Sequence, residues 1–131
     1  MNFRLTQEQL EIQEKVRDFA RREIAPLAAE IDRVERFTSE SFKKLGEMGL
    51  LGLMLPKEYG GMDGSVLTCC LVGEELSYAC ASTSMSYLAH AVLCCHNLLS
   101  NGSEEQKKKY LPDLARGAKL GAIAMTEPNA G

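Results

Sequence analysis

Residues 83–101, TSMSYLAHAVLCCHNLLSN, form the stretch that decides the fold. The stretch contains no Asp, Glu, Lys or Arg, and it is too short and too often interrupted by Ser, His and Asn to span a bilayer. Its apolar side chains fall on every side of a helical wheel: Met85, Leu88, Ala89, Val92, Leu93, Cys95, Leu98 and Leu99. A helix that is apolar all round is a buried helix. The sequence therefore predicts a central helix inside a helical domain.

The polar residues of this central stretch are Ser84, Ser86, His90, His96 and Asn97. A buried polar group needs a partner in the protein, a water or a ligand. His90 and Cys94 lie one helical turn apart, but two ligands do not make a metal site. We therefore expect His90 to form hydrogen bonds inside the core, and we predict no metal site.

An amphipathic helix is predicted near the N-terminus. Thr6 and Gln9 have the spacing of a capping box, and apolar residues recur behind them at helical spacing as far as Ile24. Pro26 cannot lie inside a helix without disturbing it, although it can begin one. We expect a kink, or a second short helix from Pro26 to about Arg33.

A further helix and a packed loop follow. We expect the helix to begin at 37–39 and to end at Gly49 as its C-cap. Residues 50–64, LLGLMLPKEYGGMDG, are apolar first and glycine-rich after, which argues against a regular element. We expect the leucines to hold this loop against the core.

The helix predicted from Ser65 to about Ala81 carries two adjacent acids, Glu74 and Glu75. Neighbours in sequence point about 100° apart on a helix. We therefore expect one exposed acid and one ion-paired acid, and no catalytic pair. Leu67 is expected to be available for burial.

The last predicted helix has a second capping box, Ser103 to Gln106, with acids in its first turn where the helix dipole favours them. Pro112 must bend this helix or lie where the next turn begins, and Gly117 ends it. The run 107–109 of three lysines is interpreted as a solvated face.

Composition bounds the class of protein. The chain has 131 residues, 45% of them hydrophobic and 25% charged, which is enough for one domain with a core. A net charge of −3 makes nucleic acid an unsuitable partner. The five cysteines include two adjacent pairs and no metal-binding spacing, so we expect five free thiols. The N-terminus has neither signal-peptide nor transit-peptide character.

The tail differs from the rest of the chain. Residues 121–125, GAIAM, are short, apolar and unhelical, and TEPNAG follows as a turn. We expect residues 1–118 to form an all-α domain of about six helices and residues 119–131 to form the first strand and turn of a second, β domain. A strand without a partner is not a stable end for a protein, so the sequence is expected to be part of a longer one.

These segments resemble acyl-CoA dehydrogenases in order along the whole chain. GAIAMTEPNAG resembles the family's flavin-contacting strand and turn, which typically ends in E-P-x-A-G-S-D. LTQEQLEIQEKVRDFARREIAP resembles its opening helix, LGLMLPKEYGG its loop, GEELSYAC its fourth helix and GSEEQKKKYLPDLARG the helix before the flavin strand. MSYLAHAVLC and AMTEPNAG look most like the isovaleryl-CoA branch.

The resemblance implies an FAD enzyme that desaturates the acyl group of an acyl-CoA thioester and passes electrons to an electron-transferring flavoprotein. It implies that Ile123, Ala124, Met125 and Thr126 run beside the flavin, with hydrogen bonds from the Thr126 hydroxyl and the Met125 main chain. Gly131 matches the turn glycine that lets the backbone approach the cofactor. Met85, Ser86 and Ala89 match positions that line the acyl pocket.

The resemblance assigns no catalytic residue to this chain, because Glu74, Glu75 and Glu127 do not match the family's catalytic glutamate. It implies a homotetramer in the cytoplasm of a prokaryote or in the mitochondrial matrix, without membrane insertion. The alternatives are an acyl-CoA oxidase or flavin monooxygenase of the same fold, and a stand-alone helical interaction module. A bound flavin would separate the enzymes from the module.

Overall fold

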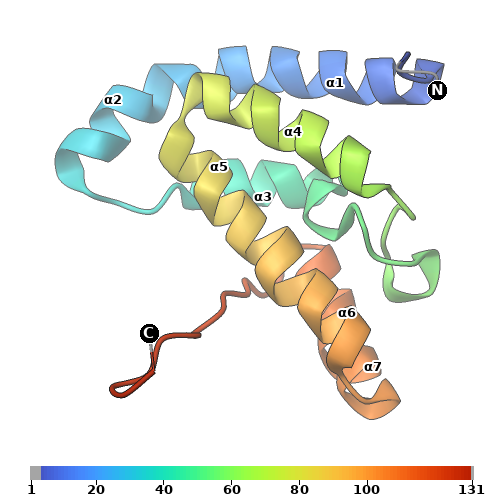
Figure 1. Ribbon diagram of the computed structural model, residues 1–131. Helices are drawn as coiled ribbons and strands as arrows, with labels where there is room; N and C mark the ends of the chain where they lie inside the picture. The colour runs from blue at the N-terminus through green and yellow to red at the C-terminus, as the bar shows by residue number, and fades with distance from the viewer. Residues whose placement is uncertain (1–3, 131) are drawn as a thin grey trace.

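The computed structural model describes residues 4–130 (Figure 1). Within this range the chain forms five continuous helical segments and no strand, which confirms the all-α prediction. The elements are α1 (Gln7–Phe19), π-helix η1 (Ala20–Ile24), α2 (Ala25–Val34), α3 (Ser39–Glu47), the 3-10 turns η2 (Leu50–Gly52) and η3 (Lys57–Tyr59), α4 (Val66–Ala79), α5 (Ala81–Leu88), π-helix η4 (Ala89–His96), α6 (Asn97–Asn101) and α7 (Glu104–Ala115).

The first segment is a bent helix made of α1, η1 and α2. Thr6 and Gln9 form the predicted capping box. The helix widens to π geometry in η1, and Pro26 lies in the first turn of α2, where its missing N–H disturbs the helix least. Figure 1 shows α2 turning away from the line of α1 at this point. The predicted kink at Pro26 and the short helix after it are both present.

The loop between α3 and α4 is tightly packed, as predicted. Gly49 follows α3 with φ 76°, a left-handed conformation that glycine adopts without strain. Four leucines of the loop are buried against the core: Leu50, Leu51, Leu53 and Leu55. Their burial explains how a glycine-rich segment keeps a defined path.

The central helix runs through α5, η4 and α6, from Ala81 to Asn101 (Figure 1). It follows α4 after a single break at Cys80, whose backbone is extended at φ −161° and ψ 110°. The sequence predicts this break one or two residues later. The helix is longer than predicted by two residues, and its middle third is a π-helix that no pattern in the sequence indicates.

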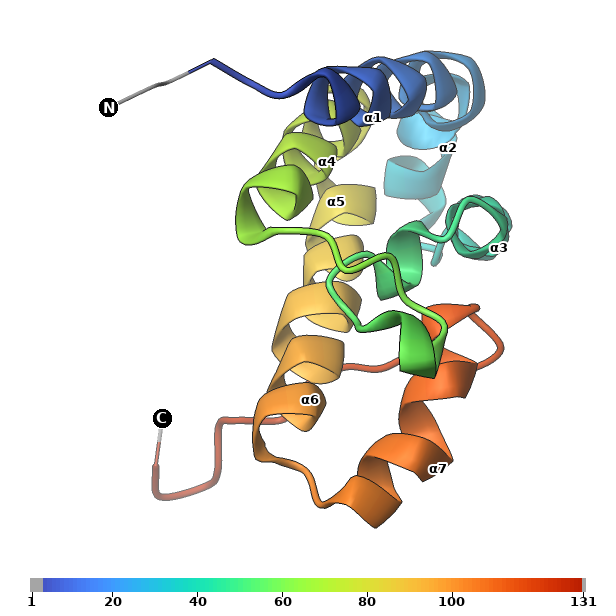
Figure 2. The same ribbon diagram turned by 90° about the vertical axis from the view of Figure 1, so that its right-hand side faces the viewer.

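Two buried clusters make up the core. The first joins α1, η1, α3, η2, α4 and the upper part of the central helix, where Tyr87 and Ala91 are its members. The second lies between the lower part of the central helix, the η3 loop and α7, and it includes Cys95 and Leu111. Figure 2 shows the central helix descending from α1 and α4 to α7. The central helix thus connects both clusters.

Complete burial of the central helix was predicted, and this prediction is wrong. Met85 is 65% exposed and Leu93 is 43% exposed. Leu67 on α4 is also half exposed, against expectation. The physical reason is that each cluster covers only one side of the helix, so apolar residues on the remaining sides stay at the surface.

The C-terminal part begins with α7, capped by Ser103 and Gln106 as predicted. Pro112 lies inside α7, which continues to Ala115. Gly117 ends the helix with φ 75°. The expected strand at 121–125 is absent from the described residues, and an isolated bridge between Glu127 and Ala130 closes a turn. A strand requires a neighbouring strand, and this segment has none within 4–130.

Two smaller expectations concern membrane insertion and thiols. In the described part of the chain, no helix combines the length and apolar character needed to cross a membrane. All five cysteines are free thiols, as predicted.

Candidate functional site

The predicted acyl-pocket residues lie on one turn of the central helix, around the junction of α5 and η4. Ser86 and Ala89 are partly buried and open into a cavity of about 240 Å³. Its other walls come from α3 and its approach, through Phe37 and Phe42, and from residues 120–122 of the C-terminal segment. The cavity is small and mostly apolar, as a pocket for a short alkyl group requires.

Met85 does not share this cavity. Its side chain is 65% exposed and is not among the residues that line the pocket of Ser86 and Ala89. On a helix, Met85 and Ala89 are one turn apart and neighbours on the surface. The structure therefore does not bring Met85 into the cavity, and its role in substrate binding stays a prediction.

The predicted flavin-binding residues come directly after residues 120–122, which line the cavity. Ile123 lines a shallow hollow of about 300 Å³ with Leu93, Cys94 and Leu98 of the central helix. Ala124, Met125 and Thr126 are exposed, and Met125 is 72% exposed. Gly131 lies outside the described residues.

The backbone of 122–126 is open to a ligand. Within residues 4–130, no backbone hydrogen bond joins this segment to another part of the chain. Ala122 and residues 124–126 are exposed and Ile123 is partly buried, so water or a flat polar ligand can reach much of this segment. The segment therefore fits the edge of a cofactor that offers ring donors and acceptors.

The segment is held to the helix immediately before this open stretch. The Gly121 N–H donates to Nδ1 of His90 over 3.0 Å. His90 is only 1% exposed, and its Nε2 lies 3.5 Å from Sγ of Cys95. Burial lowers the pKa of His90, and the backbone groups of Leu114 and Leu51 act in the opposite direction. His90 was predicted to form hydrogen bonds inside the core, and it does so.

The π-helix η4 produces this arrangement of His90 and Cys95. In an α-helix, side chains five residues apart point in directions about 140° apart. The wider π turn closes i to i+5 hydrogen bonds and aligns such residues on one side. At α-helical spacing the neighbour of His90 on the next turn would be Cys94, whereas in the structure His90 contacts Cys95.

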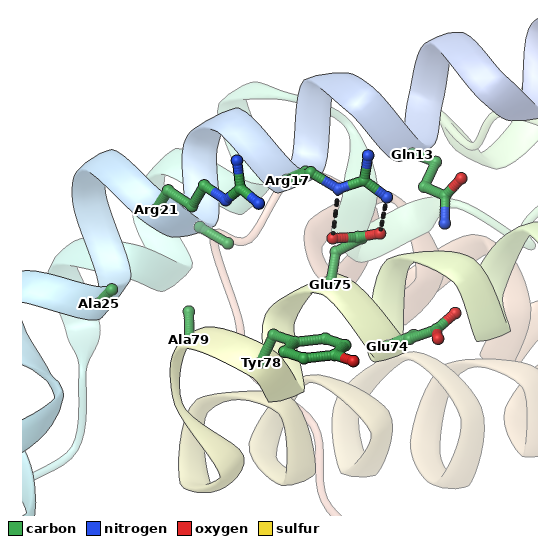
Figure 3. Close-up of a pocket in the computed structure, with 9 residues that line it drawn as sticks. Gln13, Arg17, Arg21, Ala25, Glu74, Glu75, Tyr78 and Ala79 are labelled. Atoms are coloured by element: carbon green, nitrogen blue, oxygen red, sulfur yellow. Dashed lines mark hydrogen bonds and ion pairs between the residues drawn. The ribbon is translucent and has the colours of Figure 1, made fainter.

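A second cavity, of about 500 Å³, lies between α1 and α4 and contains none of the predicted site residues (Figure 3). Arg17 and Glu75 face each other across it in a two-pronged ion pair, with Nε to Oε2 at 3.0 Å and Nη2 to Oε1 at 2.6 Å. The guanidinium of Arg17 lowers the pKa of Glu75, and burial opposes this effect. Glu75 therefore serves the packing of α4 on α1 rather than proton transfer.

Glu74 and Glu75 thus have the unequal environments predicted for them. Glu75 is buried and paired, and Glu74 is exposed at the edge of the same cavity. Glu127 is exposed in the terminal turn. Among the described residues, no group of three or more His, Cys, Asp or Glu side chains is placed to hold a metal ion.

Comparison with known proteins gives the class. The family model "Acyl-CoA dehydrogenase, N-terminal domain" matches residues 6–118. The chain therefore belongs to the acyl-CoA dehydrogenase family.

Individual relatives agree with this assignment. The chain is 49% identical over 131 residues to the short-chain-specific acyl-CoA dehydrogenase of Clostridium acetobutylicum, covering 100% of this chain and 35% of the relative. It is 45% identical over 129 residues to the mitochondrial isovaleryl-CoA dehydrogenase of Pongo abelii, covering 97% and 30%. An acyl-CoA dehydrogenase of Bacillus anthracis, solved in complex with FAD, superposes with a TM-score of 0.89 at 37% identity, covering 97% and 22%. The chain spans about a third of the length of its curated relatives.

Proposed function

We propose that this chain is the N-terminal part of an FAD-dependent enzyme that introduces an α,β double bond into a short or branched acyl-CoA. The observation that carries the proposal is the cavity in which Ser86 and Ala89 meet the start of the C-terminal segment, at Gly121 and Ala122. There the predicted acyl-binding turn meets residues 120–122, which directly precede the predicted flavin-binding residues, although the two are more than thirty positions apart in sequence.

The residues of the chain fit the cofactor. The exposed backbone from Ala122 to Thr126 offers hydrogen-bonding groups that have no other partner in the described chain. When FAD is bound, the chemistry that it would supply is a hydride acceptor for the β-carbon of the substrate. The Thr126 hydroxyl and the Met125 main chain would hold the cofactor by hydrogen bonds, and the apolar cavity would exclude water from the acyl group.

No base for removal of the α proton is proposed among the residues of this chain. Glu75 is held by Arg17, and neither Glu74 nor Glu127 lies at the cavity of Ser86 and Ala89. The base would come from a part of the enzyme outside this chain. A relative solved with FAD and relatives named for short-chain and isovaleryl substrates support the choice of cofactor and substrate class.

The partners proposed with this function are an acyl-CoA substrate, an electron-transferring flavoprotein and further copies of the same subunit in a homotetramer. The place of action is the cytoplasm of a prokaryote or the mitochondrial matrix. The test is anaerobic mixing of the intact flavin-loaded protein with butyryl-CoA or isovaleryl-CoA. Bleaching of the flavin followed by slow reoxidation in air is expected. Fast reoxidation would indicate an oxidase, and no bleaching would contradict the proposal.

The pocket assignment has its own test in Ala89→Phe. A phenyl ring at this position would fill much of the 240 Å³ cavity, so the activity should fall most for longer and branched acyl groups. A reduction of roughly tenfold or more in kcat/KM for isovaleryl-CoA relative to a three-carbon acyl-CoA is expected. Ser100→Phe, at an exposed position farther along the same helical segment, is the control. An unchanged ratio between acyl groups would exclude Ala89 from the pocket.

A further inference from the structure

We infer that His90 is the positioning residue of the cofactor-binding segment. It fixes the point at which the chain leaves the helical domain and so directs 122–126 across the face of the central helix. Its effect on flavin rests on the proposed function, while the anchoring itself does not. Four observations lead to this inference.

The first observation is the hydrogen bond itself. The Gly121 N–H donates to Nδ1 of His90, and this bond links two residues that are 31 positions apart. It is the last hydrogen bond from the segment to the helical domain before the open stretch 122–126, among the residues that the structure describes. Loss of this contact would free the segment at the position where its direction is set.

The second observation is the steric fit of Gly121. A Cβ at this position would lie 2.2 Å from Sγ and 2.8 Å from Cβ of Cys94, and 3.4 Å from Cδ2 of Leu114. Real Cβ atoms do not approach other heavy atoms that closely, so only glycine allows the backbone to touch the helix here. The hydrogen bond and the close approach fix the same residue in two independent ways.

The third observation is the state of the imidazole. Nδ1 accepts a hydrogen bond from a backbone N–H, so a neutral ring must carry its proton on Nε2. Nε2 lies beside Sγ of Cys95, and burial raises the pKa of that thiol to about 12. The thiol therefore stays neutral, and no carboxylate favours an imidazolium at these two contacts. The backbone groups of Leu114 and Leu51 do favour one, but burial is the larger effect and lowers the pKa of His90. The local chemistry keeps His90 as an acceptor.

The fourth observation is the position of His90 in the site. Its side chain lines the cavity together with Ser86, Ala89, Gly121 and Ala122. The same ring thus bounds the predicted acyl pocket and holds Gly121, which directly precedes the segment 122–126. A shift of the segment would change both the cavity wall and the placement of the cofactor.

The anchoring is tested on the 131-residue chain by amide hydrogen exchange at Gly121. His90→Phe keeps a ring of similar size and removes the acceptor, so the Gly121 amide should exchange roughly fivefold faster. His90→Asn should restore slow exchange, because its Oδ1 can take the place of Nδ1 as the acceptor. His96→Asn, at the exposed histidine of the same π-helix, should leave exchange unchanged.

Nitrogen chemical shifts of His90 give an independent readout. The unmodified chain should contain the tautomer with the proton on Nε2. A proton on Nδ1, or equal exchange at Gly121 in the unmodified chain and in His90→Phe, would overturn the inference. If His90→Phe fails to fold, the comparison of His90→Asn with Gly121→Ala decides. The second variant should release the segment through the clash with Cys94, and the first should not.

The functional half is tested on the intact flavoprotein by FAD retention and the visible spectrum. His90→Phe should weaken FAD binding roughly tenfold and shift the flavin absorbance, while His90→Asn should restore both. Equal FAD affinity and spectrum in His90→Phe would overturn the positioning role even if the enzyme is a dehydrogenase. An unmodified protein that binds no FAD would instead contradict the proposed function, and the exchange rate at Gly121 would still decide whether His90 anchors the segment.

Discussion

At the scale of single residues, the structure relies on contacts between positions far apart in sequence. Arg17 and Glu75 are 58 residues apart, and His90 and Gly121 are 31 apart. Each contact satisfies a buried polar group that would otherwise destabilise the fold. The sequence predicted that Glu74 or Glu75 would be ion-paired and that His90 would be bonded, but it did not identify the partners. Helical periodicity specifies which face a residue occupies and contains no information about which distant residue meets it.

The Arg17–Glu75 pair leads to a prediction for stability. Glu75→Gln should lower the free energy of unfolding by about 1 kcal/mol. This value takes into account that Arg17 is partly exposed, so that solvent screens its interaction with Glu75. Because the pKa of Glu75 is lowered in the folded state, its contribution is complete above the unfolded pKa and is lost as the pH falls through the folded pKa. Urea unfolding at pH 7 and at pH 3 measures both effects.

The matched control for Glu75→Gln is Asp18→Asn. It removes the exposed i,i+4 ion pair between Asp18 and Arg22, which lies within the first helical segment. An exposed pair of this kind contributes little, so no measurable change is expected. Equal effects of the two substitutions would show that burial of Glu75 has no consequence for its ion pair. A loss of stability that persists unchanged at pH 3 would contradict the electrostatic explanation.

At the scale of elements, local signals were the most predictive. Both capping boxes, the glycine stops at Gly49 and Gly117 and the disturbance at Pro26 were readable because each depends on residues within one or two turns. The two π-helices could not be predicted from the sequence, because an extra residue in a turn does not require any particular residue type. The strand expected at 121–125 needs a partner that no described residue supplies.

The capping box of α7 provides the prediction at this scale. Ser103→Ala removes the side chain that accepts from the Gln106 N–H, and it should lower the free energy of unfolding by about 1 kcal/mol. Ser100→Ala, at an exposed position in α6, should have a smaller effect because alanine is a good helix former. Chemical denaturation followed by circular dichroism compares the two. A larger loss from Ser100→Ala would contradict the importance of the cap.

At the scale of the whole molecule, the described chain buries two apolar clusters and also leaves large apolar side chains at its surface. Several large apolar side chains are exposed along α4 and the central helix, including Val66, Tyr78 and Met85. The family pattern and the central apolar helix predicted the all-α fold correctly. The exposure of Met85 could not be predicted, because an apolar residue on a helix has the same appearance in sequence whether or not another element covers it.

The prediction for the whole molecule concerns the 131-residue chain by itself. It should give a helical circular dichroism signal and yet retain no FAD after desalting, because residues 122–126 are mostly exposed and have no neighbouring strand in the described chain. Its exposed apolar side chains should also make it self-associate with rising concentration. The intact protein, treated in the same way, is the control. Stoichiometric yellow colour in the short chain would contradict the prediction.

The π-helix in the central helix has a consequence for the length of the chain. It sets the rotational phase between Tyr87, which packs in the first cluster, and Leu98 and Leu99, which pack against the second. Each residue of an α-helix adds about 100° of rotation, whereas each residue of the wider π turn adds less. If residues 89–96 formed an α-helix of the same length, the segment after them would be rotated from its present direction, and Leu98 and Leu99 would turn away from the second cluster. The π-helix therefore matches the number of residues between the two clusters to the rotation that both sets of contacts require.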